Sequence, residues 1–399
     1  MADSNGIKWK TAEINRDRLV AEFKRLVSFD SESFHEKEIS EYLKDKLRNL
    51  GLRVEEDHAK ERLLENGYLE EREGLASNIY AYLEGNAKGA PILFSSHMDT
   101  VKPGRGKKAV FSEDGTITSE GNTVLGADDI SGLVSILEAL TVLKEKNLAH
   151  PDLEILFTVA EEPYCEGSRH VEYERLRAKE GYVLDLNGAV GRAAVAAPSI
   201  LSLRVRVKGK SAHAGFAPER GINAMSIAAD ALSNIRTGRV HENLTVNFGL
   251  IHGGSGRNIV PELLEIEGEV RCLEHERAIC ETELIRQIFE KSAKKYGGSI
   301  EFTVTEHIHS YKVLEEKNVI QRFRQVVGEQ LVQKPAEFIT TYGGSDANRL
   351  NEHGIETIVV ACAMENSHET TEFTTIGELE RAAGLTLGLM TWDKGDGSF

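Results

Sequence analysis

Apolar and polar positions in the first half of the chain follow two alternating periods. Residues 15–30 and 36–50 repeat apolar positions at helical spacing, which predicts two helices, and Gly51 is placed to end the second. Residues 130–147 predict a long amphipathic helix, and the charged residues 59–74 predict an exposed hairpin or a helical insert. Short apolar runs predict strands near residues 52–56, 78–83 and 91–95. Because helix and strand keep alternating to the middle of the chain, we expect an α/β fold with a largely parallel sheet covered on both faces, an αβα sandwich.

The pattern then changes. LSLRVRVKGK (201–210) alternates apolar and basic residues, as a half-exposed strand does. The elements predicted after it are a helix, two strands, a helix and a strand, at 222–235, 244–251, 262–273, 275–296 and 299–305. This β-α-β-β-α-β order is typical of a ferredoxin-like α+β domain. Since the earlier alternation returns afterwards, we predict a discontinuous domain of residues 1–197 and 309–399, with residues 198–308 inserted.

Composition and charge narrow the function classes. The chain has 399 residues, 40% hydrophobic and 28% charged, which favours a soluble protein of two domains. Its formal net charge of −16 argues against nucleic-acid binding, which needs a basic surface. There is no run of about 18 apolar residues to span a membrane, and the N-terminus lacks the apolar core of a signal peptide. The four cysteines form no CxxC pair, so we expect reduced thiols and a cytoplasmic location.

Ionisable side chains stand at the ends of the apolar runs. These side chains are His97, Asp99, Asp128, Glu161, Glu162, Asp185 and His368. Strands of an α/β sheet bring such ends together at its carboxyl edge, where ligands bind. Two imidazoles with several carboxylates can hold two divalent ions about 3.5–4 Å apart, which can clamp and activate a water. We therefore expect a two-metal site.

Each part of this set has a plainer alternative. His97 and Asp99 are two apart at a strand end, so their side chains point the same way. One can ligate a metal while the other orients it, or they can be a structural His beside a capping Asp. Asp128, followed by a second Asp, opens a helix and can be a cap or a ligand. Asp185 can be a turn former.

The Glu161–Glu162 pair ends an apolar strand. Two buried adjacent carboxylates repel each other unless a cation neutralises one, although a solvated loop pair is the alternative. A natural division makes one Glu a ligand and the other the general base, which moves a proton from metal-bound water to the leaving amine. The strings HETTE (368–372) and HEKEI (35–39) are not the zinc motif HExxH, because each lacks the second His.

Taken together, five motifs resemble the M20 family of metallopeptidases, and most closely its peptidase T-like branch, over residues 15–392. They are SSHMDTV (95–101), GADDISG (126–132), TVAEEPYCEGS (158–168), VLDLNG (183–188) and NSHETTEF (366–373). The resemblance implies that His97 is a metal ligand oriented by Asp99, and that Asp128 bridges both ions. It implies Glu161 as the base and Glu162 as a ligand.

The resemblance also implies that Asp185 and His368 complete the two ligand shells and that the Asp128–Asp129 peptide bond is cis. Oxygen and imidazole ligands suit two zinc ions, or cobalt or manganese. Two departures from the family pattern, Ile130 for the usual Lys and DLN (185–187) for DGG, remove no ligand.

The inserted domain resembles the family's lid and dimerisation domain. The resemblance implies that His213, in GKSAHAGFAPERGINAM (209–225), stabilises the oxyanion of the tetrahedral intermediate, in its own subunit or in the partner of a homodimer. It implies that Asn258 contacts substrate. Arg271 is a candidate for gripping a substrate carboxylate, with a salt-bridged strand residue as the alternative.

The expected activity is that of a tripeptidase-like aminopeptidase. It would release the N-terminal residue of a short peptide through a metal-bridging hydroxide and the base Glu161. A carboxypeptidase or an N-acyl-amino-acid amidohydrolase on the same frame stays open, because the sequence does not show which free terminus the lid recognises. A catalytically silent binding protein is disfavoured by the intact Glu161 and the full ligand set.

Overall fold

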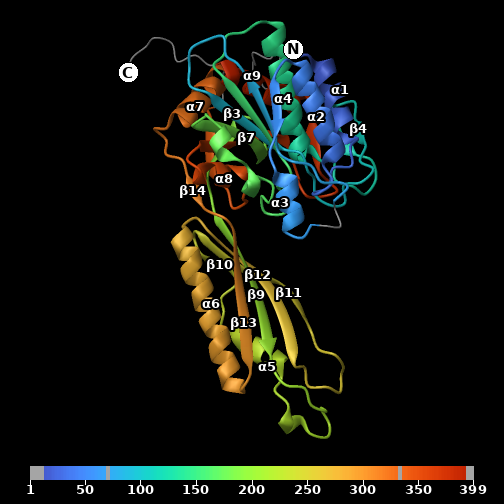
Figure 1. The fold of residues 1–399 in the computed structure, drawn as a ribbon, viewed down its shortest axis with the longest axis vertical. Coiled ribbons are helices and arrows are strands. Elements are labelled where there is room, and N and C mark those ends of the chain that lie inside the picture. Colours follow the sequence, from blue (N-terminus) through green and yellow to red (C-terminus); the bar gives the residue numbers. More distant parts are fainter. Residues whose placement is uncertain (1–12, 69–71, 331–334, 392–399) are drawn as a thin grey trace. The chain divides into compact units, whose positions relative to one another are not determined.

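The computed structural model describes residues 13–68, 72–330 and 335–391, and the chain forms two compact units (Figure 1). Unit 1 comprises Met1–Ala196, Lys312–Thr341 and Ser345–Phe399, and unit 2 comprises Ala197–Tyr311 and Tyr342–Gly344. Unit 2 therefore begins one residue before the predicted insertion, extends to Tyr311, and recruits a short later segment. In the part of the chain that is described, no helix is long and apolar enough to cross a membrane.

Unit 1 is built on a nine-stranded sheet in its described residues. Its order is β1-β2-β6-β3-β7-β16-β8-β14, with β15 also paired to β8. The strands are β1 (Arg53–Glu56), β2 (Ile79–Leu83), β3 (Ile92–His97), β6 (Leu153–Thr158), β7 (Glu180–Asn187), β8 (Arg192–Ala197), β14 (Tyr311–Lys312), β15 (Glu337–Thr340) and β16 (Glu356–Met364). The central strands β6, β3, β7 and β16 are parallel, whereas β1–β2, β2–β6 and β16–β8 pair antiparallel. The predicted parallel sheet is thus confirmed for the centre.

Helices lie to both sides of this sheet (Figure 1). They are α1 (Arg16–Val27), α2 (Lys37–Asn49), α3 (Ala59–Glu65), α4 (Ala127–Glu145), α7 (Asn318–Gln330), α8 (Asp346–Glu352) and α9 (Ile376–Thr391). Gly51 follows the end of α2 with φ 82°, a left-handed conformation that suits glycine after a helix. The predicted insert at 59–74 begins with α3, and its residues 69–71 lie outside the described chain.

Helix α4 is buried on all sides, so the predicted amphipathic helix is wrong in that respect. Every residue from Ala127 to Leu140 is buried, because α4 packs on β3, β7 and β16 and is covered by α1 and α9. Two of its polar side chains have internal partners. Glu138 pairs with Arg18 of α1 at 2.7 Å, and Ser135 Oγ donates to the carbonyl of Ser131. The apolar surface on both sides makes this helix the centre of the unit 1 core.

A small second sheet in unit 1 was not predicted. Its strands are β4 (Ala109–Phe111), β5 (Thr116–Ser119) and β17 (Phe373–Thr375), in the order β17-β5-β4. Strands of three or four residues carry too little alternation to be recognised in a sequence. The sheet ties the loop after β16 to residues far earlier in the chain.

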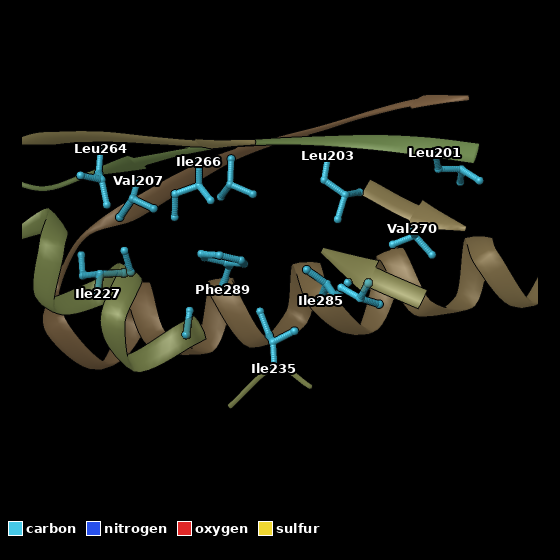
Figure 2. Packing of buried hydrophobic residues seen from close by; sticks show 14 of the residues in the cluster. Leu201, Leu203, Val207, Ile227, Ile235, Leu264, Ile266, Val270, Ile285 and Phe289 are labelled. Atoms are coloured by element: carbon cyan, nitrogen blue, oxygen red, sulfur yellow. The ribbon is translucent and has the colours of Figure 1, made fainter. Parts of the chain in front are cut away.

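Unit 2 is an antiparallel sheet with two helices packed on it. The strands β9 (Ser199–Lys208), β10 (Gly238–His241), β11 (Leu244–Gly253), β12 (Leu263–Cys272) and β13 (Ser299–Ile308) take the order β10-β11-β12-β9-β13. The helices are α5 (Ala224–Ser233) and α6 (His275–Tyr296). Alternate residues of β9, such as Leu203 and Val207, point into a core with Ile227 of α5 and Phe289 of α6 (Figure 2). The predicted elements are all present, and β10 is added to them.

Candidate metal centre

The predicted residues of unit 1 come together from five parts of the fold. These are the loops that follow β3 and β6, the start of α4, strand β7 and the loop after β16. His97 is the last residue of β3, and Glu161 and Glu162 follow β6. Asp185 lies inside β7, which continues to Asn187, rather than at a strand end. His368 lies in the loop between β16 and β17, with φ 68°.

The His97 ring is held by Asp99. Nδ1 of His97 lies 3.0 Å from the backbone oxygen of Asp99 and 3.3 Å from its Oδ1. A carbonyl oxygen only accepts hydrogen bonds, so Nδ1 carries a proton, and in the neutral form of the ring the lone pair is on Nε2. Asp99 in turn accepts from Ser33 Oγ and from the backbone N–H groups of Glu161 and Glu162. This buried carboxylate therefore fixes both the ring and the loop after β6.

The two aspartates at the start of α4 point to different partners. Asp128 Oδ1 lies 3.0 Å from His97 Nε2, and its Oδ2 lies 3.3 Å from His368 Nε2. Asp129 accepts instead from Ser96 Oγ and the backbone N–H of His97. The Asp128–Asp129 peptide bond is cis, as the resemblance implied. Asp128 is thus the carboxylate placed between the two imidazoles.

Glu161 and Glu162 have separate surroundings although they are adjacent. Oε2 of Glu162 lies 2.9 Å from His368 Nε2, while its Oε1 is buried without a hydrogen-bond partner. Glu161 is also buried, and its Oε1 accepts from Cys165 Sγ at 3.3 Å. Asp346, at the start of α8, offers an oxygen to the same small group as Glu161 and Cys165. Only Glu162 of the pair contacts an imidazole.

Two groups of donor atoms in unit 1 that each include an imidazole could hold divalent ions. One is His97, Asp128 and Asp185, and the other is Asp128, Glu162 and His368, with the atoms of each group within 4.8 Å of one another. Asp128 belongs to both. Imidazole nitrogen with carboxylate oxygen is a donor set that zinc, cobalt and manganese accept, so the residues fit two metal ions in their chemistry.

The pKa values of several titratable groups at this site are shifted from their usual range. Burial raises the pKa of Asp185 and Glu161 well above their usual range, and raises that of Glu162 to about 7. Hydrogen bonds to Asp128 and Glu162 raise the pKa of His368 to about 11. The raised carboxylate pKa values follow from burial among neighbouring carboxylates, whereas contacts with His368 and His97 lower the pKa of Asp128. Divalent cations would stabilise the same carboxylates in their ionised form.

The predicted residues of the inserted domain lie in unit 2. Nδ1 of the exposed His213 accepts from the backbone N–H groups of Gly215 and Phe216, so its neutral ring carries the proton on Nε2. The backbone oxygen of Asn258 accepts from Ala214, which pairs the two loops. Arg271 makes a two-point salt bridge to Glu269 and donates to the carbonyl of Tyr342, which is the alternative that the sequence left open.

Some residues of the site were not found from the sequence. Glu372 accepts from the backbone N–H groups of Gly126 and Asp128 and so fixes the start of α4. The buried Glu36 accepts from Ala160 N–H, and Asp346 lies beside Glu161. The sequence assigned none of them a role, not even Glu372 inside NSHETTEF, since their contacts form only in the folded chain.

The chain resembles known peptidases over nearly its whole length. The sequence profile of the Peptidase dimerisation domain of the M20 family matches residues 195–297, and that of Peptidase family M28 matches residues 78–214. The uncharacterized protein YqjE of Bacillus subtilis (strain 168) is 37% identical over 377 residues, 94% of this chain and 98% of that protein.

Solved structures agree with the sequence matches. A tripeptidase from Staphylococcus aureus subsp. aureus Mu50 has a TM-score of 0.89 and 33% identity, over 95% of this chain and 99% of that one. Aminopeptidase PepT from Bacillus cereus ATCC 10987 has a TM-score of 0.85 and 36% identity, with the same coverage of both chains. A dinuclear metal binding peptidase of the M20 family from Bacillus subtilis, 18% identical with a TM-score of 0.68, shares the fold. The chain therefore belongs to the M20 family of metallopeptidases, which are hydrolases, and within it to the peptidase T-like branch.

Proposed function

We propose that this protein is a two-metal aminopeptidase that releases the N-terminal residue from short peptides, with tripeptides as its substrates. The observation that carries the proposal is the arrangement of carboxylates in unit 1. Asp128 belongs to both donor groups, whereas Glu161 belongs to neither of them and lies beside them. Asp128 would therefore join the two ions, and Glu161 would be available to transfer protons. The names of the tripeptidase and PepT structures support the choice of substrate.

The metal-holding roles follow from the contacts. His97, Asp128 and Asp185 would hold one ion, and Asp128, Glu162 and His368 the other. Zinc is the ion we propose, with cobalt or manganese as substitutes. When bound, the ions would polarise a substrate carbonyl and make a water acidic enough to lose a proton near neutral pH.

The chain's own groups would then move the proton. Glu161 would take it from the attacking water, hold it on a carboxylate oxygen, and give it to the leaving amine. Asp99 would keep His97 in one tautomer throughout, because its backbone oxygen holds Nδ1–H. The buried setting of Glu161 keeps bulk water away from its carboxyl group, so the proton it holds goes to the substrate.

Unit 2 would supply substrate contacts and the dimer interface. We propose His213 as the donor that stabilises the oxyanion, because its Nε2 carries a proton while Nδ1 is held by the loop. Asn258, in the loop paired with that of His213, would contact the substrate. Arg271 would have to leave Glu269 before it could bind a carboxylate, so we give it no substrate role. The match to the dimerisation-domain profile supports a homodimer.

We further propose a cytoplasmic location. The cysteines Cys165, Cys272, Cys280 and Cys362 are all free thiols in the structure. Free thiols are the usual state in a reducing compartment.

The test is hydrolysis of one tripeptide in three forms, with both termini free, with the amino group acetylated, and with the carboxyl group amidated. We expect the free form to release its N-terminal residue, and the acetylated form to be inert, as measured by chromatography of the products. EDTA should abolish turnover, and zinc, cobalt or manganese should restore it. Protein carrying Glu161→Gln, purified identically, controls for contaminating peptidases.

Other outcomes would replace the proposal. Release of the C-terminal residue from the acetylated peptide would make the protein a carboxypeptidase, and cleavage of N-acyl amino acids alone would make it an amidohydrolase. Full turnover in protein shown by elemental analysis to be free of metal would remove the two-metal mechanism.

A further inference from the structure

A second cluster of metal-ligating side chains lies in unit 2. His275 is the first residue of α6, Glu306 lies on β13, and His309 follows the end of that strand. One donor atom from each of the three lies within 4.8 Å of the other two. None of the three belongs to the donor groups of unit 1, and none was singled out by a sequence motif.

Both imidazoles of the cluster lie close to the same carboxylate oxygen of Glu306. Nε2 of His275 lies 3.5 Å from Oε2 of Glu306, and Nε2 of His309 lies 3.3 Å from the same atom. The two rings lie 4.1 Å apart between centroids at an angle of 41°. Neutral rings present lone pairs, which are what a metal ion binds.

A second contact orients one of these rings. Nδ1 of His275 lies 3.0 Å from Ser199 Oγ, and that hydroxyl accepts from the backbone N–H of Ser310 at 2.7 Å. A hydroxyl has two lone pairs, so Ser199 can also accept from Nδ1–H. That tautomer leaves the Nε2 lone pair directed at Glu306. Holding the far nitrogen of a ligating His in this way is the usual support of a protein metal site.

We propose that His275, Glu306 and His309 form a further metal site for a transition-metal ion of the zinc class. Two imidazoles and one carboxylate are a common zinc ligand set, which leaves one coordination position for water. The side chains of His275, Glu306 and His309 are 25%, 46% and 37% exposed, so an ion can enter from solvent. The ion would tie the start of α6 to the segment that leaves β13, two residues before the end of this continuous part of unit 2.

The plainer alternative is a surface His–Glu pair with a neighbouring His, which needs no metal. The metal site and the metal-free surface cluster predict different zinc contents for the protein. We would load the full-length chain with zinc, remove free ion by gel filtration, and measure zinc per chain by elemental analysis. His309→Asn and Glu306→Gln should each lose one zinc ion relative to the unchanged protein. His307→Asn is the matched control, because this neighbouring His contacts Ser202 Oγ instead and should keep the full content.

Ser199→Ala tests the orienting contact without removing a ligand. We expect it to weaken zinc binding at this site about 10–100-fold, as titration calorimetry of the metal-free chain would measure. Circular dichroism would verify that every variant is folded. Equal zinc content in the unchanged protein, His309→Asn and Glu306→Gln would overturn the proposal. If these variants fail to fold, a calorimetric titration of the unchanged chain that shows no binding beyond the ions of unit 1 would overturn it as well.

Discussion

Glu161 and Glu162 show how adjacent residues of one type acquire different chemistry from their contacts. Glu162 reaches an imidazole, whereas Glu161 faces Cys165. We predict that Glu161→Gln lowers kcat by about 10²–10⁴ with metal content unchanged, since an amide cannot accept the proton. Glu162→Gln should instead lower metal content. Steady-state kinetics with elemental analysis measures both.

The reverse pattern would contradict this division of roles. Glu166→Gln is a suitable control, because this Glu lies in the same segment and pairs with Arg169. It should leave both metal content and kcat close to those of the unchanged protein.

Lys107 is a buried cation with a predictable pH signature. Its Nζ donates to the carbonyls of Phe29 and Gly104 and to Thr100 Oγ1, and burial lowers its pKa to about 8. The unfolded chain, with a Lys pKa of about 10.4, binds more protons between about pH 8 and 10.4. The contribution of Lys107 to the free energy of unfolding is therefore constant below pH 8 and rises by about 3 kcal/mol through this window.

In Lys107→Met this contribution disappears. The difference in unfolding free energy between the unchanged protein and Lys107→Met should grow from pH 7.5, roughly where Lys107 is still charged, towards pH 10. Urea titrations at several pH values would measure it. Lys108→Met removes the exposed neighbouring Lys and should show no such trend. A pH-independent difference for Lys107→Met would mean that Lys107 stays charged throughout.

The sequence predicted the residues that the structure gathers in unit 1, because each ends or follows an apolar run and the family pattern covers them. Asp346 was not singled out, since an Asp that opens a helix looks like any other cap. Glu36 stands in HEKEI (35–39), but nothing in the sequence placed it at the site. Its burial depends on the folded loop after β6, to which it binds at Ala160.

At the scale of elements, the start of α4 depends on a residue from the other end of the chain. Glu372, next to β17, accepts the backbone N–H groups of Gly126 and Asp128 with its two oxygens. Glu372→Gln would replace one acceptor by a donor that faces an N–H group. We predict a metal affinity about 10–100-fold weaker, measured by competition with a chelator.

Glu369→Gln is the matched control for this prediction. Glu369 lies in the same loop, is exposed, and accepts from the nearby Thr371 Oγ1. It should keep its metal affinity. An unchanged affinity in Glu372→Gln, with a lowered melting temperature, would show that Glu372 is structural only.

Long elements were predicted and short ones were missed, because a long element repeats its apolar pattern more often. The bounds of α6 were predicted as observed, because its apolar positions repeat over 22 residues. The burial of α4 on all sides was not predicted. The charged residues at 144–147 gave the predicted helix a polar part, which is typical of an amphipathic helix. The four-residue β10 left no detectable alternation.

At the scale of the whole molecule, the outer edge of β11 is a candidate for the dimer interface. In the described chain, β10 pairs with β11 only as far as Val246, so the rest of β11 has β12 alone beside it. Leu250 and Ile251 on this stretch are 52% and 55% exposed. A strand edge with exposed apolar side chains is suited to pairing with a second copy.

We predict that Leu250→Lys and Ile251→Lys weaken dimerisation about tenfold or more, the usual cost of losing a central apolar contact. Light scattering over a concentration series would measure the dissociation constant. Val304→Lys, on the other edge strand β13, is the control and should leave the dimer intact. A monomer at micromolar concentration for the unchanged protein would rule out a stable dimer and any role of His213 in a partner subunit.

The position of β16 in the sheet sets an order for biosynthesis. β7 and β8 follow each other in the chain, yet β16 lies between them, and the whole continuous segment of unit 2 is made before it. At roughly 5–20 residues per second, a ribosome needs roughly ten seconds or more to reach β16 after finishing β8. During this time β7 and β8 have open edges that can pair with other chains. The nascent protein should therefore depend on chaperones until β16 is made, even though the continuous segment of unit 2 is complete well before then.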